Sequence, residues 1–365
     1  MIRAILFKGR VKGKGIVNYD SKDQKWVLRE RFPEQRDYLR HDNIRIAKHA
    51  FYKVGEKDGK PVWEKRLYIS ADCLRQAIFG EDFPFQNTMI MQHPDLLLKV
   101  IATIPALVRG YFYAEEGKIS LKRKSPLMVT GAEQVAGGVS HFEVNTMSGQ
   151  KRQKENVDDL SDTSLHYEEK IGEVEYAFEG AIDIKELQFI SMSETYDRLA
   201  VNPDQCEKYR KYLGKQLDSE VGNMQYYQIK SAVIKMPEEG ILLTQGQVAK
   251  IIGEVVKRIL SLRIQRSKGY AHISSLEAKI LRDPFDNMGD EGGWISIKKP
   301  EELKLKPEEI EVFYDPVEES EAMALLNVIK QNQADQEQKR KESQEEKKSK
   351  KRGRKDATES ADSQV

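Results

Sequence analysis

The chain has 365 residues, of which 39% are hydrophobic and 33% are charged, and its formal net charge is +1. This composition suits one large domain with insertions, or two domains. No apolar run reaches the roughly 18 residues that a membrane helix needs, and the start is too short and too basic for a signal peptide, so we expect no export. Cys73 and Cys206 lack the spacing of a disulfide framework or a zinc site and fit a reducing cytoplasm.

Charge is distributed unevenly along the chain. Residues 1–154 hold 28 Lys and Arg side chains against 17 Asp and Glu, whereas residues 155–200 hold 3 against 13. A basic body with one acidic stretch indicates a polyanionic partner on one side and a complementary surface of another copy on the other. Two solvated faces would give the same counts, so the counts alone do not decide.

The first predicted strand lies within residues 2–19 and alternates apolar with basic residues. Its cations form a rim around three glycines and are Lys8, Arg10, Lys12 and Lys14. The glycine spacing matches neither a phosphate loop nor a dinucleotide fingerprint. Nucleotide hydrolysis is therefore rejected, and an electrostatic contact to a polyanion remains.

A long polar and aromatic insertion, residues 20–65, follows this strand and contains a hairpin turn at residues 57–60. The next segment predicts a helix that Ser70 caps and Gly80 ends. Arg75 points away from the apolar stripe of that helix. It is either solvated surface or a phosphate contact.

Residues 94–104 predict a further helix, and residues 107–113 predict a strand. After them comes a cluster of three cations that a following proline stiffens: Lys122, Arg123 and Lys124. Such clusters are solvated surface more often than binding sites.

The second half of the chain begins with polar residues 137–175, which predict a loop or an extended hairpin. Residues 176–192 predict a strand with a turn, and residues 195–240 form a third insertion. Residues 247–262 have the apolar period of a helix. This helix leads directly into a basic segment.

Residues 263–273 are predicted as one alternating strand with three cations, a glycine and an aromatic ring. Because every second side chain of a strand faces the same way, Lys268, Tyr270 and His272 should line up. Residues 268–273 also match most of the RNP1 pattern of RNA-binding domains, with His272 where the second aromatic belongs. On spacing alone, a surface strand leaving a helix is the alternative.

The predicted core order is strand, helix, strand, strand, helix, strand, which is the order of an α+β, RRM-like (ferredoxin-like) sheet. Four separated motifs resemble the backbone subunit of type I CRISPR Cascade complexes, most closely the minimal type I-F variant. The motifs are residues 66–75, residues 122–127, residues 180–191 followed by 196–200, and residues 264–270. The resemblance covers roughly residues 2–280, and the insertions and the tail depart from it.

The resemblance implies one RRM-like palm over residues 1–330, with thumb and finger segments inserted at about 20–65, 137–175 and 195–240. Which insertion is the thumb stays open, with the latter two favoured. Several copies would stack head to tail as a helical filament along one guide RNA (crRNA) and leave its bases free for target DNA. The implied partners are crRNA, target DNA through the guide, other copies of the chain, other Cascade subunits and a helicase-nuclease, in the cytoplasm and away from membranes.

Holding RNA without regard to sequence demands cations along a phosphate track and surfaces for stacking. By motif position, the resemblance places Ser70 and Arg75 where a helix start and a basic side chain meet the RNA phosphates. The candidate RNA-binding residues are Lys8, Arg10, Lys12, Lys14, Arg66, Ser70, Arg75, Lys122, Arg123, Lys124, Arg263, Arg266, Lys268 and Tyr270.

No catalysis, cofactor or resident metal is predicted, since no metalloprotease or nucleophile motif occurs. One alternative is a type III-like backbone subunit that cuts target RNA with a loop aspartate and a divalent metal. Its candidate residues are Asp20, Asp158, Asp159 and Asp162. The other alternative is an RRM-type RNA binder that does not polymerise.

The acidic stretch over residues 155–197 is a candidate surface for the basic rim of a neighbouring copy, with Glu168, Glu169 and Glu173 as positions for a charge-reversal test. Residues 331–365 are rich in Lys, Glu, Gln and Ser and are expected to be a disordered charged tail.

Overall fold

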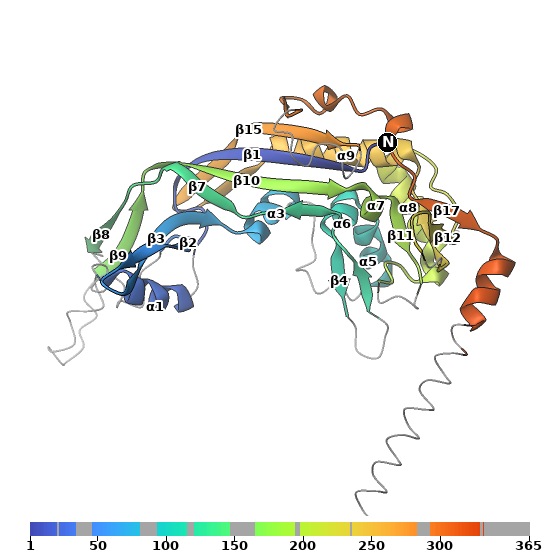
Figure 1. Ribbon diagram of the computed structural model, residues 1–365, viewed down its shortest axis with the longest axis horizontal. Helices are drawn as coiled ribbons and strands as arrows, with labels where there is room; N and C mark the ends of the chain where they lie inside the picture. The colour runs from blue at the N-terminus through green and yellow to red at the C-terminus, as the bar shows by residue number, and fades with distance from the viewer. Residues whose placement is uncertain are drawn as a thin grey trace, which may run out of the picture.

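The computed structural model describes residues 1–19, 22–33, 46–80, 93–114, 120–146, 165–193, 198–233, 236–282, 293–328 and 331. The body is an elongated arch (Figure 1). A long sheet runs along the top of the arch, hairpins project at one end, and a second, smaller sheet lies at the other end.

The main sheet is antiparallel and has nine strands within the described residues. Along the sheet the strands are β14 (Arg263–Arg266), β15 (Gly269–Leu281), β1 (Ala4–Gly15), β10 (Glu173–Asp183), β7 (Ala132–Gly137), β3 (Lys60–Ile69) and β2 (His49–Lys57). Off this path, β6 (Leu127–Val129) pairs with β10 and β16 (Ile295–Ser296) pairs with β15.

The central strand β1 sends its side chains alternately to two very different environments. Ile5, Phe7 and Val11 are at most 3% exposed, whereas the Lys and Arg residues between them are exposed. Both neighbours, β10 and β15, pair with β1 along almost its whole length. One face of the sheet therefore belongs to the apolar core, and the other is polar.

The helices that cover the apolar face are α3 (Ala71–Phe79), α5 (Pro94–Ile101), α6 (Ile104–Arg109) and α9 (Gln245–Leu260). The Ser70 hydroxyl accepts a hydrogen bond from the Cys73 amide at the start of α3, and Gly80 follows the last turn. A capping box of Thr244 and Gln247 begins α9. The predicted helices at 70–80, 94–104 and 247–262 are confirmed.

The predicted strand at residues 107–113 is wrong in its first half. Those residues complete α6, which Thr103 begins by accepting a hydrogen bond from the Ala106 amide at 3.3 Å. Pro105 fits the first turn, where its missing N–H costs nothing. Gly110, at a φ of 70°, ends the helix. Only then does β4 (Tyr111–Tyr113) begin, paired with β5 (Leu121–Arg123).

The far end of the arch is built around a four-stranded sheet. Its strands, in order, are β11 (Phe189–Ser191), β13 (Glu238–Leu242), β12 (Gln225–Ile229) and β17 (Tyr314–Val317). Helices α7 (Ile184–Gln188) and α8 (Cys206–Leu217) and the 3₁₀ turn η4 (Pro203–Gln205) lie in the same part of the chain. Residues 195–240, expected to be an insertion, thus supply the strand β12 and the helix α8, which buries one face, and no hairpin projects from the described part of them.

The last described segment runs back along the body as a strap, residues 293–317. It contains the 3₁₀ turns η5 (Pro300–Leu303) and η6 (Pro307–Glu309), which contact α9. The Ile2 amide donates to the carbonyl of Glu309 at 2.7 Å, so the strap holds the start of β1. A helix over 319–328 follows β17.

Two hairpins project from the end of the arch opposite the smaller sheet (Figure 1). One is β2–β3, with helix α1 (Lys22–Arg31) beside it, and its turn has positive φ at Asp58 and Gly59, as the predicted turn at 57–60 requires. The other is β8 (Ser140–Thr146) with β9 (Leu165–Ile171). Both fall in segments predicted to be insertions.

Residues 263–273 form a tight hairpin and not one strand. Arg263 pairs with His272, and Arg266 pairs with Gly269, so the chain reverses at Ser267 and Lys268. The alternation predicted from Tyr270 onward holds, because Ala271 is 1% exposed and Tyr270 is 53% exposed. Lys268 lies in the turn and cannot belong to the same strand face.

The α+β class is confirmed by this arrangement. Among the described residues, no helix is long and apolar enough to cross a membrane. Apart from residue 331, the predicted tail lies outside the described residues.

Candidate nucleic-acid interface

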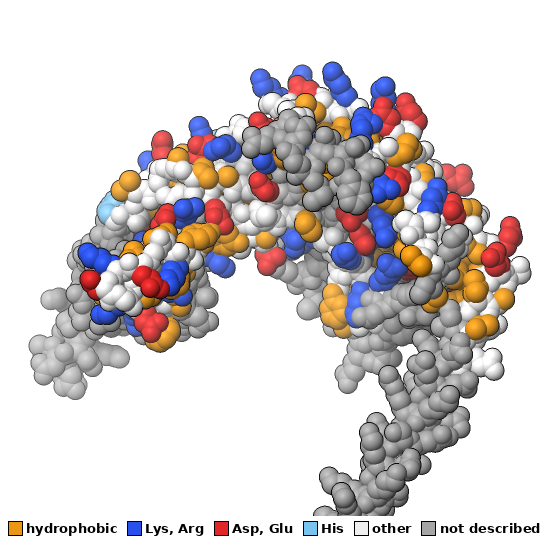
Figure 2. All heavy atoms as spheres, in the orientation of Figure 1, with side chains coloured by type: hydrophobic (Ala, Val, Ile, Leu, Met, Phe, Trp, Pro, Cys, Tyr) orange, Lys and Arg blue, Asp and Glu red, His pale blue; other side chains and the backbone are white. Residues whose placement is uncertain are grey.

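The polar face of the main sheet brings the rim of β1 together with its two neighbouring strands. Lys8, Arg10, Lys12 and Lys14 all lie on this face because they occupy every second position of β1. In the register with β10, Lys14 stands opposite Glu173, Lys12 opposite Glu175 and Lys8 opposite Glu179. Figure 2 shows the resulting mixture of basic and acidic side chains over the body.

The four cations of the β1 rim fall into two halves, Lys8 with Arg10 and Lys12 with Lys14, which differ in their partners within the protein. Lys8 lies 3.9 Å from Glu179 and 4.5 Å from the centre of the Trp294 ring, and Arg10 lies 3.7 Å from Glu175. No ion pair of Lys12 or Lys14 is found among the described residues. The expectation that the acidic stretch faces a neighbour's rim needs correction here, because part of that stretch faces the rim of its own chain.

The β14–β15 hairpin extends the second half of the rim. His272 stands between Arg263 and Lys12 in the strand register, and Tyr270 stands between Gln265 and Lys14. Residues that pair across neighbouring strands point to the same face of the sheet. Each of these two rows therefore combines at least one cation with an aromatic ring.

Tyr270 is a lining residue of two cavities. One, of about 430 Å³, lies at the β14–β15 turn and is bounded by Lys14, Arg266, Lys268 and Lys170. The other, of about 320 Å³, lies over the sheet and has these lining residues: Lys12, Gly13, Ala136, Gly137, Glu173, Val174, Glu175, Tyr270 and His272.

The wall of the larger cavity contains a buried acid that joins two hairpins. Glu169 of β9 is 1% exposed, and its carboxylate accepts a hydrogen bond from the Ala47 amide at 2.9 Å. Its other oxygen lies 3.7 Å from Nε2 of His49 on β2. Burial raises the pKa of Glu169, and burial together with the charge of Lys65 lowers the pKa of His49 to about 3. Glu169 is therefore unsuitable as a surface position for charge reversal.

Residues at the start of α3 lie beside the end of β1. Asn18, just after β1, donates to the Ser70 hydroxyl at 3.3 Å. Arg75 lies 3.8 Å from Asp72 and is largely shielded by the protein, with 29% of its side chain exposed. Burial is the main cause that lowers the pKa of Arg109, and the positive charge of the nearby Arg75 lowers it further. The Ser70 hydroxyl serves as the cap of α3.

Arg66 lies on β3 of the β2–β3 hairpin. Its guanidinium is 2.8 Å from Glu64 and 5.0 Å from the centre of the Tyr52 ring. The hydrogen bond to Glu64 raises the pKa of Arg66 and lowers that of Glu64. Both side chains are about half exposed, so water can compete for this pair.

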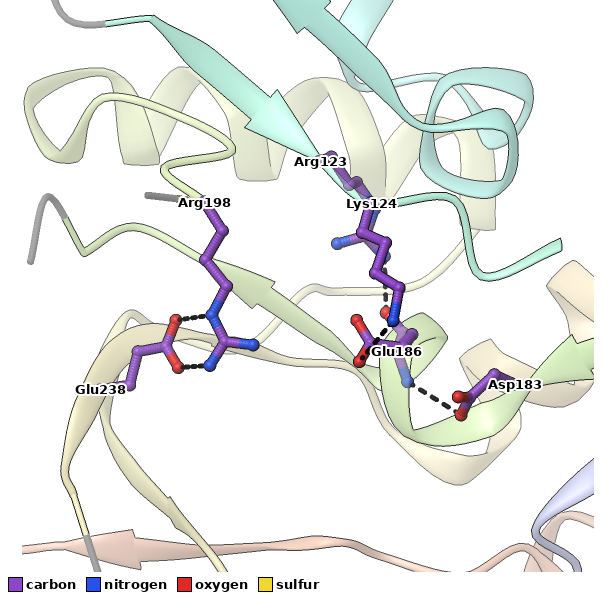
Figure 3. A network of polar contacts seen from close by, with 6 residues as sticks. All are labelled: Arg123, Lys124, Asp183, Glu186, Arg198 and Glu238. Carbon is purple, nitrogen blue, oxygen red and sulfur yellow. Dashed lines mark hydrogen bonds and ion pairs between the residues drawn. The ribbon is translucent and has the colours of Figure 1, made fainter. Parts of the chain in front are cut away.

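The side chains of the three cations at 122–124 lie in three different environments. Lys122 lies 5.4 Å from the ring centre of Phe112, which is 65% exposed. Lys124 is exposed and lies 3.5 Å from Glu186 (Figure 3).

Arg123 corrects the sequence prediction, because its side chain points into the protein. It is 7% exposed, and its guanidinium donates to the carbonyls of Leu107, Phe189, Glu186 and Leu187 at 2.8–3.3 Å. Those carbonyls end helices α6 and α7 or follow them, and a delocalised cation satisfies them well. We therefore assign Arg123 to the fold and remove it from the candidate contacts.

A neighbouring ion pair closes the same corner of the structure. Arg198 donates from Nε and Nη2 to the two carboxylate oxygens of Glu238, while Asp183 caps α7 by accepting from the Glu186 amide at 3.2 Å (Figure 3). Glu238 is 5% exposed, so this pair is part of the packing between β13 and the segment after β11.

Sequence reasoning missed Lys170 and Phe112. Lys170 belongs to the acidic stretch, and only the contact of β9 with β1 brings it to the β14–β15 turn. Phe112 could be recognised by its place beside Lys122 in the short β4–β5 ladder, which the predicted strand at 107–113 obscured. The aspartates of the enzymatic alternative, Asp20 and the three in the loop, lie outside the described residues.

Residues 1–287 match a family model described as type I-Fv CRISPR-associated protein Cas7fv-like. Because this match spans most of the chain, the protein belongs to that family of type I CRISPR-associated proteins, and the resemblance in the four motifs is confirmed. None of the curated proteins matches the chain.

Two solved structures are distantly similar. A chain of a CRISPR RNA-guided surveillance complex is 11% identical, with a TM-score of 0.28 over 65% of this chain and 66% of that one. A chain of a CRISPR RNA-guided surveillance complex in a pre-nicking state is 9% identical, with a TM-score of 0.36 over 75% of each chain. These likenesses are too weak to bear on fold or function.

We predict that replacing Arg123 destabilises the protein without a specific effect on nucleic-acid binding. Arg123→Met keeps the apolar stem but leaves the buried carbonyls without donors, and should cost roughly 3 kcal/mol of unfolding free energy. Lys124→Met, at an exposed neighbour, should change it by less than about 1 kcal/mol. Urea unfolding measures both. An Arg123→Met protein of unchanged stability that loses nucleic-acid binding would restore Arg123 as a contact.

We also predict an acid-sensitive contribution from His49. The unfolded chain takes up a proton near the ordinary pKa of 6.5, whereas the folded protein resists it until pH falls to about 3, so this contribution to stability is lost as pH falls between these values. At pH 5 the loss should be about 2 kcal/mol. Glu169, with a raised pKa, acts in the opposite direction, so the comparison is with His49→Asn. Urea midpoints at pH 7 and pH 5 that shift equally in both proteins would contradict the assignment.

Proposed function

We propose that this chain is a non-catalytic, crRNA-binding backbone subunit that oligomerises along the guide spacer in a CRISPR interference (Cascade) complex. Membership of the Cas7fv-like family supports this role. The observation that carries it is the half of the rim formed by Lys12 and Lys14, which continues across β15 into Arg263 beside the exposed ring of Tyr270.

Such an arrangement suits a single strand that is held regardless of sequence. Cations on β1 and β14, with β15 between these strands, can follow a phosphate backbone, and an exposed ring can stack on any base. A grip on phosphates leaves the Watson–Crick edges of most bases free. The guide could then pair with target DNA while the protein holds it.

The strand order supports an RRM-like palm as the body of this subunit. The strands β15, β1, β10 and β6 lie side by side and antiparallel, with α3 between β1 and β6 in the chain and α9 between β10 and β15. This is the order of a ferredoxin-like sheet. The hairpins β2–β3 and β8–β9 then extend from one end of the palm and are the candidates for finger and thumb.

The domain boundaries follow from the same proposal. Residues 1–330 form the palm with its insertions, and residues 331–365 form a charged tail outside it. The strap over residues 293–317 lies beyond the family match yet holds the start of β1, so we include it in the palm.

The proposed partners are crRNA, target DNA through the guide, further copies of the chain, other Cascade subunits and a helicase-nuclease, in the cytoplasm. Identical subunits that stack head to tail form an open helix, which a guide strand limits in length. This separates the proposal from a single RRM-type binder.

The two halves of the rim provide the test, because each supplies two cations. Lys12→Ala with Lys14→Ala should weaken binding of a guide-length RNA and reduce the slope of log affinity against log salt by about 1.4, since each phosphate contact on a single strand contributes about 0.7. Lys8→Ala with Arg10→Ala is the matched control. It should change the slope by less than half as much, because Lys8 and Arg10 already have partners within the protein. Glu179 and Glu175 pair with them, and the Trp294 ring contacts Lys8.

Fluorescence anisotropy over a salt series gives both slopes, and urea unfolding checks that both double variants are folded. Equal slopes for the wild type and the Lys12 and Lys14 variant would contradict a role for this half of the rim. A wild-type protein that retains no RNA at low salt would contradict the proposed function as a whole.

A further inference from the structure

The two cavities beside Tyr270 differ in charge. The cavity at the β14–β15 turn is lined by four cations, Lys14, Lys170, Arg266 and Lys268. Among the described residues that line it, the one acid is Glu169, which is buried and accepts a hydrogen bond from a backbone amide. A cluster of this kind, with no exposed acid among those described residues, favours a dianionic or monoanionic phosphate group.

Close backbone packing shapes that cavity. The Ile16 amide donates to the Lys268 carbonyl at 3.1 Å, which fixes the turn against the end of β1. A Cβ atom on Gly15 would lie 2.1 Å from the same carbonyl, and a Cβ atom on Gly269 would lie 2.6 Å from the amide nitrogen of Ile16. The cations therefore project from a rigid edge made of two touching main chains.

The cavity over the sheet is suited to a different group. Glu173 and Glu175 line it together with Lys12 and His272, so its acids would repel a phosphate. Carboxylates accept hydrogen bonds from hydroxyl and exocyclic amino groups. The floor is formed by small residues, Gly13, Ala136 and Gly137, which leave room for a flat ring.

Tyr270 lines both cavities. Its side chain is 53% exposed, and no hydrogen bond of its hydroxyl is found among the residues that the structure describes. A large exposed ring on a residue shared by a cationic cavity and a cavity with hydrogen-bond acceptors is placed as a stacking surface would be.

We propose that these cavities form one nucleotide subsite, in which the cationic cavity at the turn holds a phosphate and Tyr270 stacks on the base that lies over the sheet. The proposal rests on the proposed RNA-binding function and deepens it. In this proposal three parts of the chain contact the same nucleotide: the turn of the β14–β15 hairpin, the side chain of Tyr270 and the end of β9. The contribution of β9 is Lys170.

The subsite predicts where a photoreactive base attaches. RNA substituted with 5-iodouridine forms crosslinks on irradiation with aromatic side chains that stack on it. With the full chain and saturating RNA, mass spectrometry should find Tyr270 among the crosslinked residues. Tyr270→Phe should retain the crosslink and the affinity, whereas Tyr270→Ala should lose the crosslink and bind roughly 5- to 100-fold more weakly, as loss of one base stack does.

The phosphate cavity is tested by Arg266→Ala, with Lys211→Ala as the control, since Lys211 is an exposed cation of α8 that lies outside the candidate interface. Arg266→Ala should reduce the salt slope by about 0.7, and at saturating RNA the crosslink at Tyr270 should persist. Lys211→Ala should change neither quantity.

The outcomes separate this subsite from the proposed function. Normal RNA binding with crosslinks only at other aromatic residues, or a Tyr270→Ala protein of unchanged affinity, would overturn the subsite and leave the proposed function standing. A folded wild-type chain that neither binds nor crosslinks RNA would overturn both.

Discussion

The pairing of β1 with β10 and β15 is the interaction on which the rest of the structure depends. Because this one strand is bonded on both edges, its alternation of apolar and basic side chains fixes which face of the sheet meets the helices. A register shift of one residue would bury Lys8 and Lys12 and expose Ile5 and Phe7. The same strand register therefore determines both the apolar core and the basic face of the candidate interface.

That constraint also explains why the basic rim is not uniform. The antiparallel register brings acids of β10 opposite the cations of β1, while the strap sets Trp294 over Lys8. These contacts neutralise the first half of the rim, and the β14–β15 hairpin adds cations to the second half. A chain of nearly zero net charge can thus still present a cationic surface, since location and pairing matter more than the total.

The sequence predicted well those elements whose signals are local. The cap at Ser70, the apolar period of α9 and the turn at Asp58 and Gly59 depend on near neighbours in the chain. Arg123 could not be assigned from its cluster, because its carbonyl partners come from segments up to 66 residues away. The reversal at Ser267 and Lys268 was missed because Ser267 is only a weak turn signal, Lys268 is none, and the pairing that reveals the turn involves two strands.

The central claim is that copies of this chain assemble along a guide by gripping its backbone. Native mass spectrometry of the protein with crRNA-like strands of increasing length tests it most directly. The account predicts that the number of bound copies rises in equal steps as the strand lengthens, and that the steps are independent of base sequence. One bound copy on every strand, whatever the length of the strand, would contradict it. A chain that stays monomeric and retains no RNA in dilute salt would also contradict it.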